Sequence, residues 1–228
     1  KYYNPLEVKY AYNDINSLNT PLKDLFYLLS TNVIIDKISK ITNIHNLEYD
    51  KYLHGAGLHS HPRYGRLNMH LDYERHPIYE NKQRRINIIL FLNKEWKEEW
   101  NGENQFWSKD MKKCCVKTYP KFNRALLFQT NEISWHGVPK KILCPENIFR
   151  KTIAYYYISP LENSRENSRE NNKFGDDGSG YRTKASFIKI PNDKSALKIN
   201  ELYKIRSHRR ITDLDIKKIC PDWTLEKY

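Results

Sequence analysis

Short runs of β-forming residues alternate with breaks of Gly, Pro and Asn between about residue 50 and residue 160. Runs of this length, bounded by turn-forming residues, are typical of β-strands. They fall at residues 66–71, 85–92, 104–107, 115–118, 124–129 and 152–158. Many short strands at this spacing predict a barrel or a two-sheet jelly roll.

Two amphipathic helices are expected before these runs. In the first, over residues 21–30, Thr20 is the expected N-cap and Pro21 the first helical residue. Its apolar residues recur at helical spacing, at positions 22, 25, 26 and 29. The second helix has apolar residues on one face, at positions 34, 35, 38 and 41. Both helices are therefore expected to pack on the β core.

The 228 residues are expected to form a single domain. The helices occupy residues 20–50 and the β core residues 51–160. Residues 161–183 repeat a polar Glu-Asn-Ser-Arg unit and then become rich in Gly and Asp, which predicts a mobile polar loop. A mixed C-terminal extension over residues 184–228 is expected to pack on the core, with a strand at 187–190 and helices at 195–205 and 213–219.

The formal net charge of +12 is compatible with a polyanionic partner. Lys and Arg are spread along the whole chain, however, so a nucleic-acid partner stays open but is not favoured. The densest basic cluster, at residues 206–210, suits a solvated connection better than a contact with nucleic acid or an acidic partner. No apolar run approaches the roughly 18 residues of a membrane span, so no membrane partner is expected.

The four cysteines show neither the spacing of a zinc site nor that of a disulfide framework. The first residues also lack the features of a signal peptide. We therefore expect an intracellular, cytoplasmic protein in a reducing compartment.

His70 and Asp72 stand two residues apart at the end of the run at 66–71. Strand residues two apart point the same way, so one strand end can present both side chains. An oxygen-activating Fe(II) centre takes two imidazoles and one carboxylate and keeps its other positions open. His136, in Ser-Trp-His-Gly between two β runs, is the best candidate for the second imidazole. In a chain with eight histidines, the His70 and Asp72 pair alone would also fit a coincidence.

Arg150 heads the last β run, shortly after His136. A guanidinium at this place can hold the far end of a dicarboxylate through a bidentate ion pair. The alternative is an arginine that caps a strand edge. Trp135 is expected close to the metal by chain geometry, because it precedes a candidate ligand.

The order of these motifs resembles the prolyl hydroxylase-like branch of the 2-oxoglutarate and Fe(II)-dependent dioxygenase superfamily. The resemblance covers roughly residues 20–160, and the ordered set is far more specific than any one motif. It implies an α+β fold, with a double-stranded β-helix of the jelly-roll or cupin-like kind at the core. The motifs are His70-x-Asp72, the run at 85–92 with the segment 92–96, Phe122-Asn123-Arg124, His136-Gly137 and Arg150-Lys151-Thr152.

The resemblance also implies roles for single residues. His70, Asp72 and His136 would bind Fe(II), and Arg150 would pair with the remote carboxylate of 2-oxoglutarate. Thr152, which points the same way as Arg150 in a strand, is expected to add a hydrogen bond.

One position departs from the pattern of the relatives. They often carry a tyrosine that helps to bind the co-substrate, where this sequence has Phe91, which lacks the hydroxyl. Asn87 or Tyr155 is expected to replace that contact. Tyr155 and Trp135 are also the candidates for lining the substrate site.

The implied activity is hydroxylation of a C–H bond with O2, with release of succinate and CO2 and with ascorbate as a stimulant. The expected substrate is a prolyl residue in a protein or peptide, or a proline-like small molecule. Two alternatives stay open: hydroxylation or demethylation of a nucleic-acid base, which the net charge favours, and a metal-binding jelly roll without enzymatic activity, which Arg150 argues against.

Overall fold

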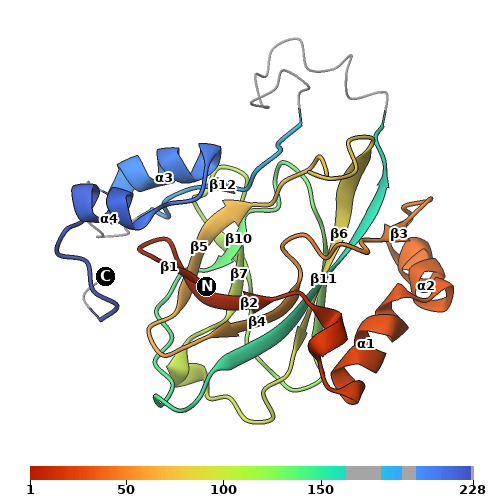
Figure 1. Cartoon of the computed structure of the whole chain (residues 1–228), viewed down its shortest axis with the longest axis horizontal. Helices are drawn as coiled ribbons and strands as arrows, with labels where there is room; N and C mark the ends of the chain where they lie inside the picture. The colour runs from red at the N-terminus through yellow and green to blue at the C-terminus, as the bar shows by residue number, and fades with distance from the viewer. Residues whose placement is uncertain (163–180, 192–198, 227–228) are drawn as a thin grey trace.

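The computed structural model describes residues 1–162, 181–191 and 199–226, which form a curved antiparallel β structure flanked by helices (Figure 1). Its helices are α1 (Thr20–Ser30), α2 (Asn32–Thr42), α3 (Ile199–His208) and α4 (Asp213–Ile219). Its strands are β1 (Tyr2–Asn4), β2 (Glu7–Tyr12), β3 (Glu48–Tyr49), β4 (Gly57–His61), β5 (Arg66–Leu71), β6 (Lys82–Phe91), β7 (Asn104–Trp107), β8 (Cys114–Thr118), β9 (Ala125–Gln129), β10 (His136–Val138), β11 (Arg150–Pro160) and β12 (Ser186–Phe187).

The strands follow one another in the order β8-β7-β10-β5-β2-β4-β11-β6-β9. Strand β2 joins two halves, because its start pairs with β5 and its end with β4. The halves face each other, since Asn87 on β6 donates a hydrogen bond to Asp72 just after β5. This confirms the predicted α+β fold with a jelly-roll core of the double-stranded β-helix type.

Strand β11 separates the interior of the jelly roll from the packing face of the helices. Its Tyr155 and Tyr157 turn toward α1, where Tyr155 lies beside the Phe26 ring and the Tyr157 hydroxyl donates to the Leu29 carbonyl oxygen. Together with α2 they form the largest apolar core. The alternate residues of β11 therefore face inward.

The two N-terminal helices lie together beside this strand, as the sequence predicts (Figure 1). Helix α1 begins at Thr20, but its N-cap is Asn19, whose side chain accepts a hydrogen bond from the Leu22 amide. The expectation that Thr20 is the cap is therefore wrong by one residue. Pro21 still lies in the first turn, where a missing amide proton costs nothing.

Strands β1, β2, β3, β4 and β10 are not among the elements that the sequence predicts. The most important difference from the prediction lies in residues 1–12. Strand β2 connects the two halves of the sheet and is part of the domain core. Leu6, between β1 and β2, is fully buried.

The C-terminal extension packs on the outer side of β5 through its own apolar cluster. Strand β12 pairs with β5, which places Phe187 opposite His70, and α3 and α4 lie over it (Figure 1). The Asn68 side chain on β5 donates to the Tyr203 hydroxyl of α3 at 2.7 Å. The mobile loop predicted over 161–183 falls mostly on residues 163–180, and part of the helix predicted over 195–205 falls on 192–198, both outside the described residues.

No helix of the described ranges has both the length and the apolar character needed to cross a bilayer.

We predict that Leu202→Ala loosens the extension from the core. Leu202 on α3 is fully buried in the C-terminal cluster, so its loss should lower the free energy of unfolding by about 2–4 kcal/mol in a urea titration. Leu214→Ala on α4 is the matched control, because the side chain of Leu214 is 77% exposed. Equal unfolding midpoints for the two variants would contradict this packing.

Candidate metal centre

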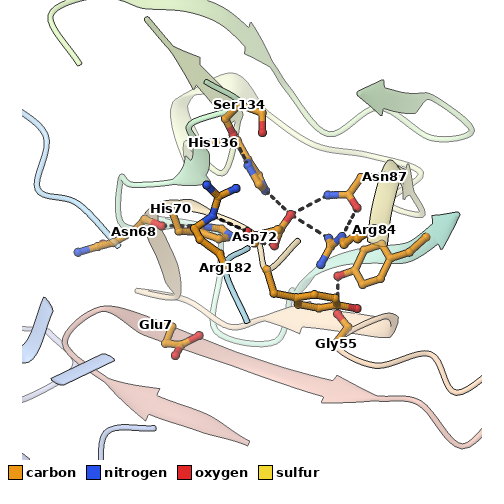
Figure 2. A network of polar contacts seen from close by, with 12 residues as sticks. Glu7, Gly55, Asn68, His70, Asp72, Arg84, Asn87, Ser134, His136 and Arg182 are labelled. Atoms are coloured by element: carbon orange, nitrogen blue, oxygen red, sulfur yellow. Dashed lines mark hydrogen bonds and ion pairs between the residues drawn. The ribbon is translucent and has the colours of Figure 1, made fainter. Parts of the chain in front are cut away.

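Two neighbouring strands bring three buried side chains together. His70 lies on β5, Asp72 follows that strand, and His136 opens β10 directly opposite His70 in the register. One ligand atom from each lies within 4.8 Å of the others (Figure 2). Gly137 permits this approach, because a Cβ there would lie 2.7 Å from the Leu67 carbonyl oxygen on β5.

Backbone carbonyl groups fix the orientation of both imidazoles. Nδ1 of His70 lies 2.9 Å from the Asn68 oxygen, and Nδ1 of His136 lies 2.8 Å from the Ser134 oxygen. A carbonyl oxygen only accepts, so each Nδ1 carries the proton and each Nε2 offers a lone pair. Burial, with His70 nearby, lowers the pKa of His136 to about 4, so this imidazole is neutral near physiological pH.

The carboxylate of Asp72 faces both Nε2 atoms. Its Oδ1 lies 3.6 Å from Nε2 of His70, and its Oδ2 lies 3.4 Å from Nε2 of His136. Oδ2 also accepts hydrogen bonds from Arg84 and Asn87, each at 2.8 Å (Figure 2). Burial alone would raise the pKa of Asp72, but Arg84 and the imidazoles outweigh it and hold that pKa well below its usual range.

Arg84 is itself held firmly. Its Nε donates to Oδ1 of Asn87 at 2.7 Å, and its guanidinium lies 3.2 Å from the centre of the Tyr156 ring. The Tyr156 hydroxyl in turn donates to the Gly55 carbonyl oxygen. On the other side, Nε of Arg182 donates to the Asp72 carbonyl oxygen. Asp72 is thus fixed by its neighbours in both side chain and backbone.

The donor set fits a mononuclear divalent metal. Two neutral imidazoles and one carboxylate converge from one side, as in the facial triad of Fe(II) oxygenases. Their other atoms are already occupied by hydrogen bonds that fix tautomer and direction, which is the support that metal ligands usually have. We assign His70, Asp72 and His136 as the candidate metal ligands.

A cavity of about 350 Å³ opens beside these ligands. The inward residues of the facing strands line it, among them His59 of β4, Ile89 of β6 and Ala154 of β11. Asn104 of β7 lines it as well. The candidate metal centre is therefore reached through a pocket inside the jelly roll.

Arg150 is buried in the interior as a cation. It is 2% exposed, its Nε donates to the Gly102 carbonyl oxygen at 2.6 Å, and its second terminal nitrogen donates to Asn104. Burial lowers the pKa of Arg150 to about 9, which still leaves it protonated at neutral pH. Within the described ranges, no carboxylate lies at ion-pair distance from Arg150.

Two histidines next to Arg150 have buried ring nitrogens without a hydrogen-bond partner in the described protein. His61 lies opposite Arg150 in the register, and His59 lies opposite Thr152. Nε2 of His59 and both ring nitrogens of His61 are buried without a hydrogen-bond partner. Burial, together with the nearby cations Lys9 and Arg150, holds the pKa of each histidine well below its usual value. Thr152 is buried and stays a predicted contact of the co-substrate.

The structure places the remaining predicted site residues, Asn87, Tyr155 and Trp135, in different surroundings. Asn87 lines the cavity, but its amide contacts Asp72 and Arg84, and a contact with co-substrate stays a prediction. The prediction that placed Tyr155 at the site is corrected, because a strand alternates its faces and Tyr156 is the one that lines the cavity. Trp135 is half-buried and is not among the residues that line the cavity.

The sequence did not predict that Arg84 and Tyr156 belong to the site. Arg84 lies at an inward position of β6, and a charged residue buried in a strand is the signal that points to a buried partner. That partner, Asp72, lies across the interior, so periodicity along β6 alone does not reveal it.

We predict that Arg84→Met weakens metal binding, because Asp72 loses the charged donor that fixes its Oδ2. The apparent affinity for Co(II) at neutral pH should fall about tenfold or more, followed by the visible absorption of the bound ion. Arg85→Met is the matched control, since Arg85 pairs with Glu162 instead. Unchanged affinity in folded Arg84→Met protein would rule out this positioning role.

Comparisons with known proteins agree with this geometry. A model of the 2OG-Fe(II) oxygenase superfamily matches residues 56–158, the stretch that contains all three candidate ligands and Arg150. No curated protein matches the sequence significantly.

Solved structures of prolyl hydroxylases are similar to this chain, and one of them shares its fold. A Pseudomonas putida prolyl-4-hydroxylase aligns with a TM-score of 0.50 and 13% identity, over 71% of this chain and 77% of that protein. A Trichoplax adhaerens prolyl hydroxylase, in complex with a hypoxia inducible factor peptide fragment, is 20% identical with a TM-score of 0.39, over 59% of this chain. A prolyl 4-hydroxylase from Phytophthora capsici is 18% identical with a TM-score of 0.39, over 83% of this chain. The match spans only 56% of each of the latter two proteins.

The matched core and its fold lead to one conclusion. Residues 56–158 match the 2OG-Fe(II) oxygenase superfamily, and the chain shares its fold with a prolyl-4-hydroxylase.

Proposed function

We propose that this protein is an Fe(II)- and 2-oxoglutarate-dependent dioxygenase that hydroxylates a prolyl residue of a peptide or protein. One arrangement carries the proposal: His70, Asp72 and His136 converge on a cavity whose lining residue Asn104 contacts Arg150. Arg150 is a buried cation without a carboxylate partner in the described ranges. The match of residues 56–158 to the oxygenase superfamily supports the same reaction class.

The metal would be held by Nε2 of His70, Nε2 of His136 and a carboxylate oxygen of Asp72. Oδ1 is the better candidate of the two carboxylate oxygens, because Oδ2 already accepts from Arg84 and Asn87. When Fe(II), 2-oxoglutarate and O2 are bound, they supply the oxidation that converts C–H to C–OH, with succinate and CO2 as co-products. The chain's own part is to fix the ligands, enclose the site and position one C–H bond.

The co-substrate would be held by Arg150. An unpaired guanidinium inside a protein is costly, and a carboxylate offsets that cost through charge-assisted hydrogen bonds. Asn104 connects Arg150 to the cavity wall, because it accepts from Arg150 and lines the cavity. Thr152 and the unpartnered nitrogen of His59 offer further hydrogen bonds to a bound dicarboxylate.

A peptide is preferred over a free amino acid as the substrate. The cavity extends from the metal ligands to residues of the N-terminal strands and of α3, which leaves room for a chain on both sides of a target residue. The prolyl target rests on the fold shared with the Pseudomonas enzyme. A proline-like small molecule remains the alternative substrate, and ascorbate is expected to stimulate turnover. An intracellular location is part of the proposal, because all four cysteines are free.

We predict that Arg150→Gln raises the KM for 2-oxoglutarate. Loss of a buried charge pair costs about 2 kcal/mol or more, which corresponds to an increase of roughly thirtyfold. Arg150→Lys should recover part of the affinity, since the charge returns without the bidentate geometry. Lys151→Gln is the control, because Lys151 points outward from the same strand. An unchanged KM in Arg150→Gln would place the co-substrate elsewhere.

The proposed function itself is tested by succinate formation. Iron-loaded protein given 2-oxoglutarate, O2 and a proline peptide should release succinate and add the mass of one oxygen to the peptide. His70→Ala should abolish both signals, because the metal loses an imidazole ligand. A peptide with alanine in place of proline should gain no oxygen. Metal binding without succinate or modified peptide would instead favour a jelly roll without enzymatic activity.

A further inference from the structure

The C-terminal extension contributes basic side chains to the cavity that holds the metal ligands. Arg206 on α3, with Arg209 and Arg210 just after it, lines this cavity, and so does Lys9 of β2. The sequence suggested a solvated connection for this basic cluster. The structure instead places it at the entrance of the candidate active site.

The charges that line the cavity are unbalanced. Six cationic side chains of the described residues line it, against two carboxylates, Glu7 and Asp72. Both carboxylates are engaged: Glu7 pairs with Nε of Arg206, and Asp72 belongs to the metal centre. The cationic lining residues are Lys9, Arg84, Lys184, Arg206, Arg209 and Arg210.

Two of these cations have no carboxylate at ion-pair distance within the described ranges, namely Lys9 and Arg210. Both lie over the ring of Tyr2, with the Lys9 nitrogen 5.0 Å and the Arg210 guanidinium 5.2 Å from its centre. Arg210 also donates to the Tyr2 hydroxyl at 3.2 Å. Tyr2 therefore contacts two positively charged groups at the cavity, where they are available to bind an anion.

The neighbouring arginines are positioned by acids of the protein itself. Arg209 forms two hydrogen bonds with the carboxylate of Asp215, at 2.6 and 2.7 Å. Arg206 pairs with Glu7 and stacks over the ring of Phe187. These contacts hold the basic segment in place beside Lys9 and Arg210.

The aromatic rings argue against a nucleobase as the ligand. Nucleic-acid sites stack bases on open aromatic faces. Here each tyrosine and phenylalanine that lines the cavity has a cation over its ring: Tyr2 as described, Phe187 under Arg206, and Tyr73 and Tyr156 beside Arg84. Carboxylate side chains of a peptide suit this surface better, because they require cations and no free ring.

We propose that Lys9 and Arg210 select substrate peptides in which acidic residues flank the target residue. The proposal rests on the proposed function for the identity of the target, but the charge preference is a property of the cavity entrance. It therefore has a readout in binding that does not need turnover.

The test measures binding of labelled proline peptides to Co(II)-loaded protein with 2-oxoglutarate, in the absence of O2, by fluorescence anisotropy. One peptide has glutamates on both sides of the proline, and its counterpart has glutamines. The glutamate peptide should bind about tenfold more tightly, and added salt should reduce the difference. Equal affinities of the two peptides would overturn the proposal.

Single substitutions test whether Lys9 and Arg210 cause the preference for the glutamate peptide. Arg210→Gln and Lys9→Gln should each reduce affinity for the glutamate peptide about three- to fivefold and leave that for the glutamine peptide nearly unchanged. Lys204→Gln is the matched control, because Lys204 is exposed on α3 and does not line the cavity. A preference that survives in both variants would overturn the assignment to Lys9 and Arg210.

Two further outcomes separate this inference from its alternatives. A single-stranded oligonucleotide that binds more tightly than the glutamate peptide, and displaces it, would overturn the choice of an acidic peptide. A binding preference for the glutamate peptide without any succinate or hydroxylated product would support the charge selection and count against the proposed function alone.

Discussion

The ion pair between Asp72 and Arg84 is the contact on which the metal centre depends. It joins the end of β5 to β6 across the interior of the jelly roll, and it places a charge beside a carboxylate that is itself buried. A buried pair of this kind adds little net stability, yet loss of one partner is costly because the other stays unpaired. The network of Asn87, Tyr156 and Gly55 therefore holds Arg84 at one place, and the carboxylate keeps its direction before any metal arrives.

Much of the β core and the three ligands could be predicted from the sequence, because they depend on local signals. The runs at 66–71 and 104–107 coincide with β5 and β7 residue for residue, since alternation and turn residues mark both ends. His70 and Asp72 could be paired because two strand positions share a face. His136 required the order of motifs, because β10 has only three residues and no pattern of its own.

The parts that escaped prediction depend on long-range contacts. Neighbouring residues of a strand face opposite sides of the sheet, so Tyr155 and Tyr156 cannot both point into the cavity. Nothing in a run of three tyrosines indicates which of them points inward. The Lys, Tyr and Glu pattern of residues 1–12 is weakly apolar, so the central place of β2 follows only from its partners β4 and β5. The role of the basic cluster after α3 likewise depends on residues far away in the sequence, such as Glu7 and Tyr2.

The entrance of the cavity joins segments from opposite ends of the described chain: Tyr2, Glu7 and Lys9 come first, and Arg206 and Arg210 come almost last. The contact between Tyr2 and Arg210 joins residues 208 positions apart, and closing a loop of that length costs more conformational entropy than closing a short one. During synthesis, all three metal ligands leave the ribosome well before α3 does, so an early intermediate would contain the ligand strands without the complete entrance. The residues that bind the metal are thus synthesised before the residues that complete the substrate entrance.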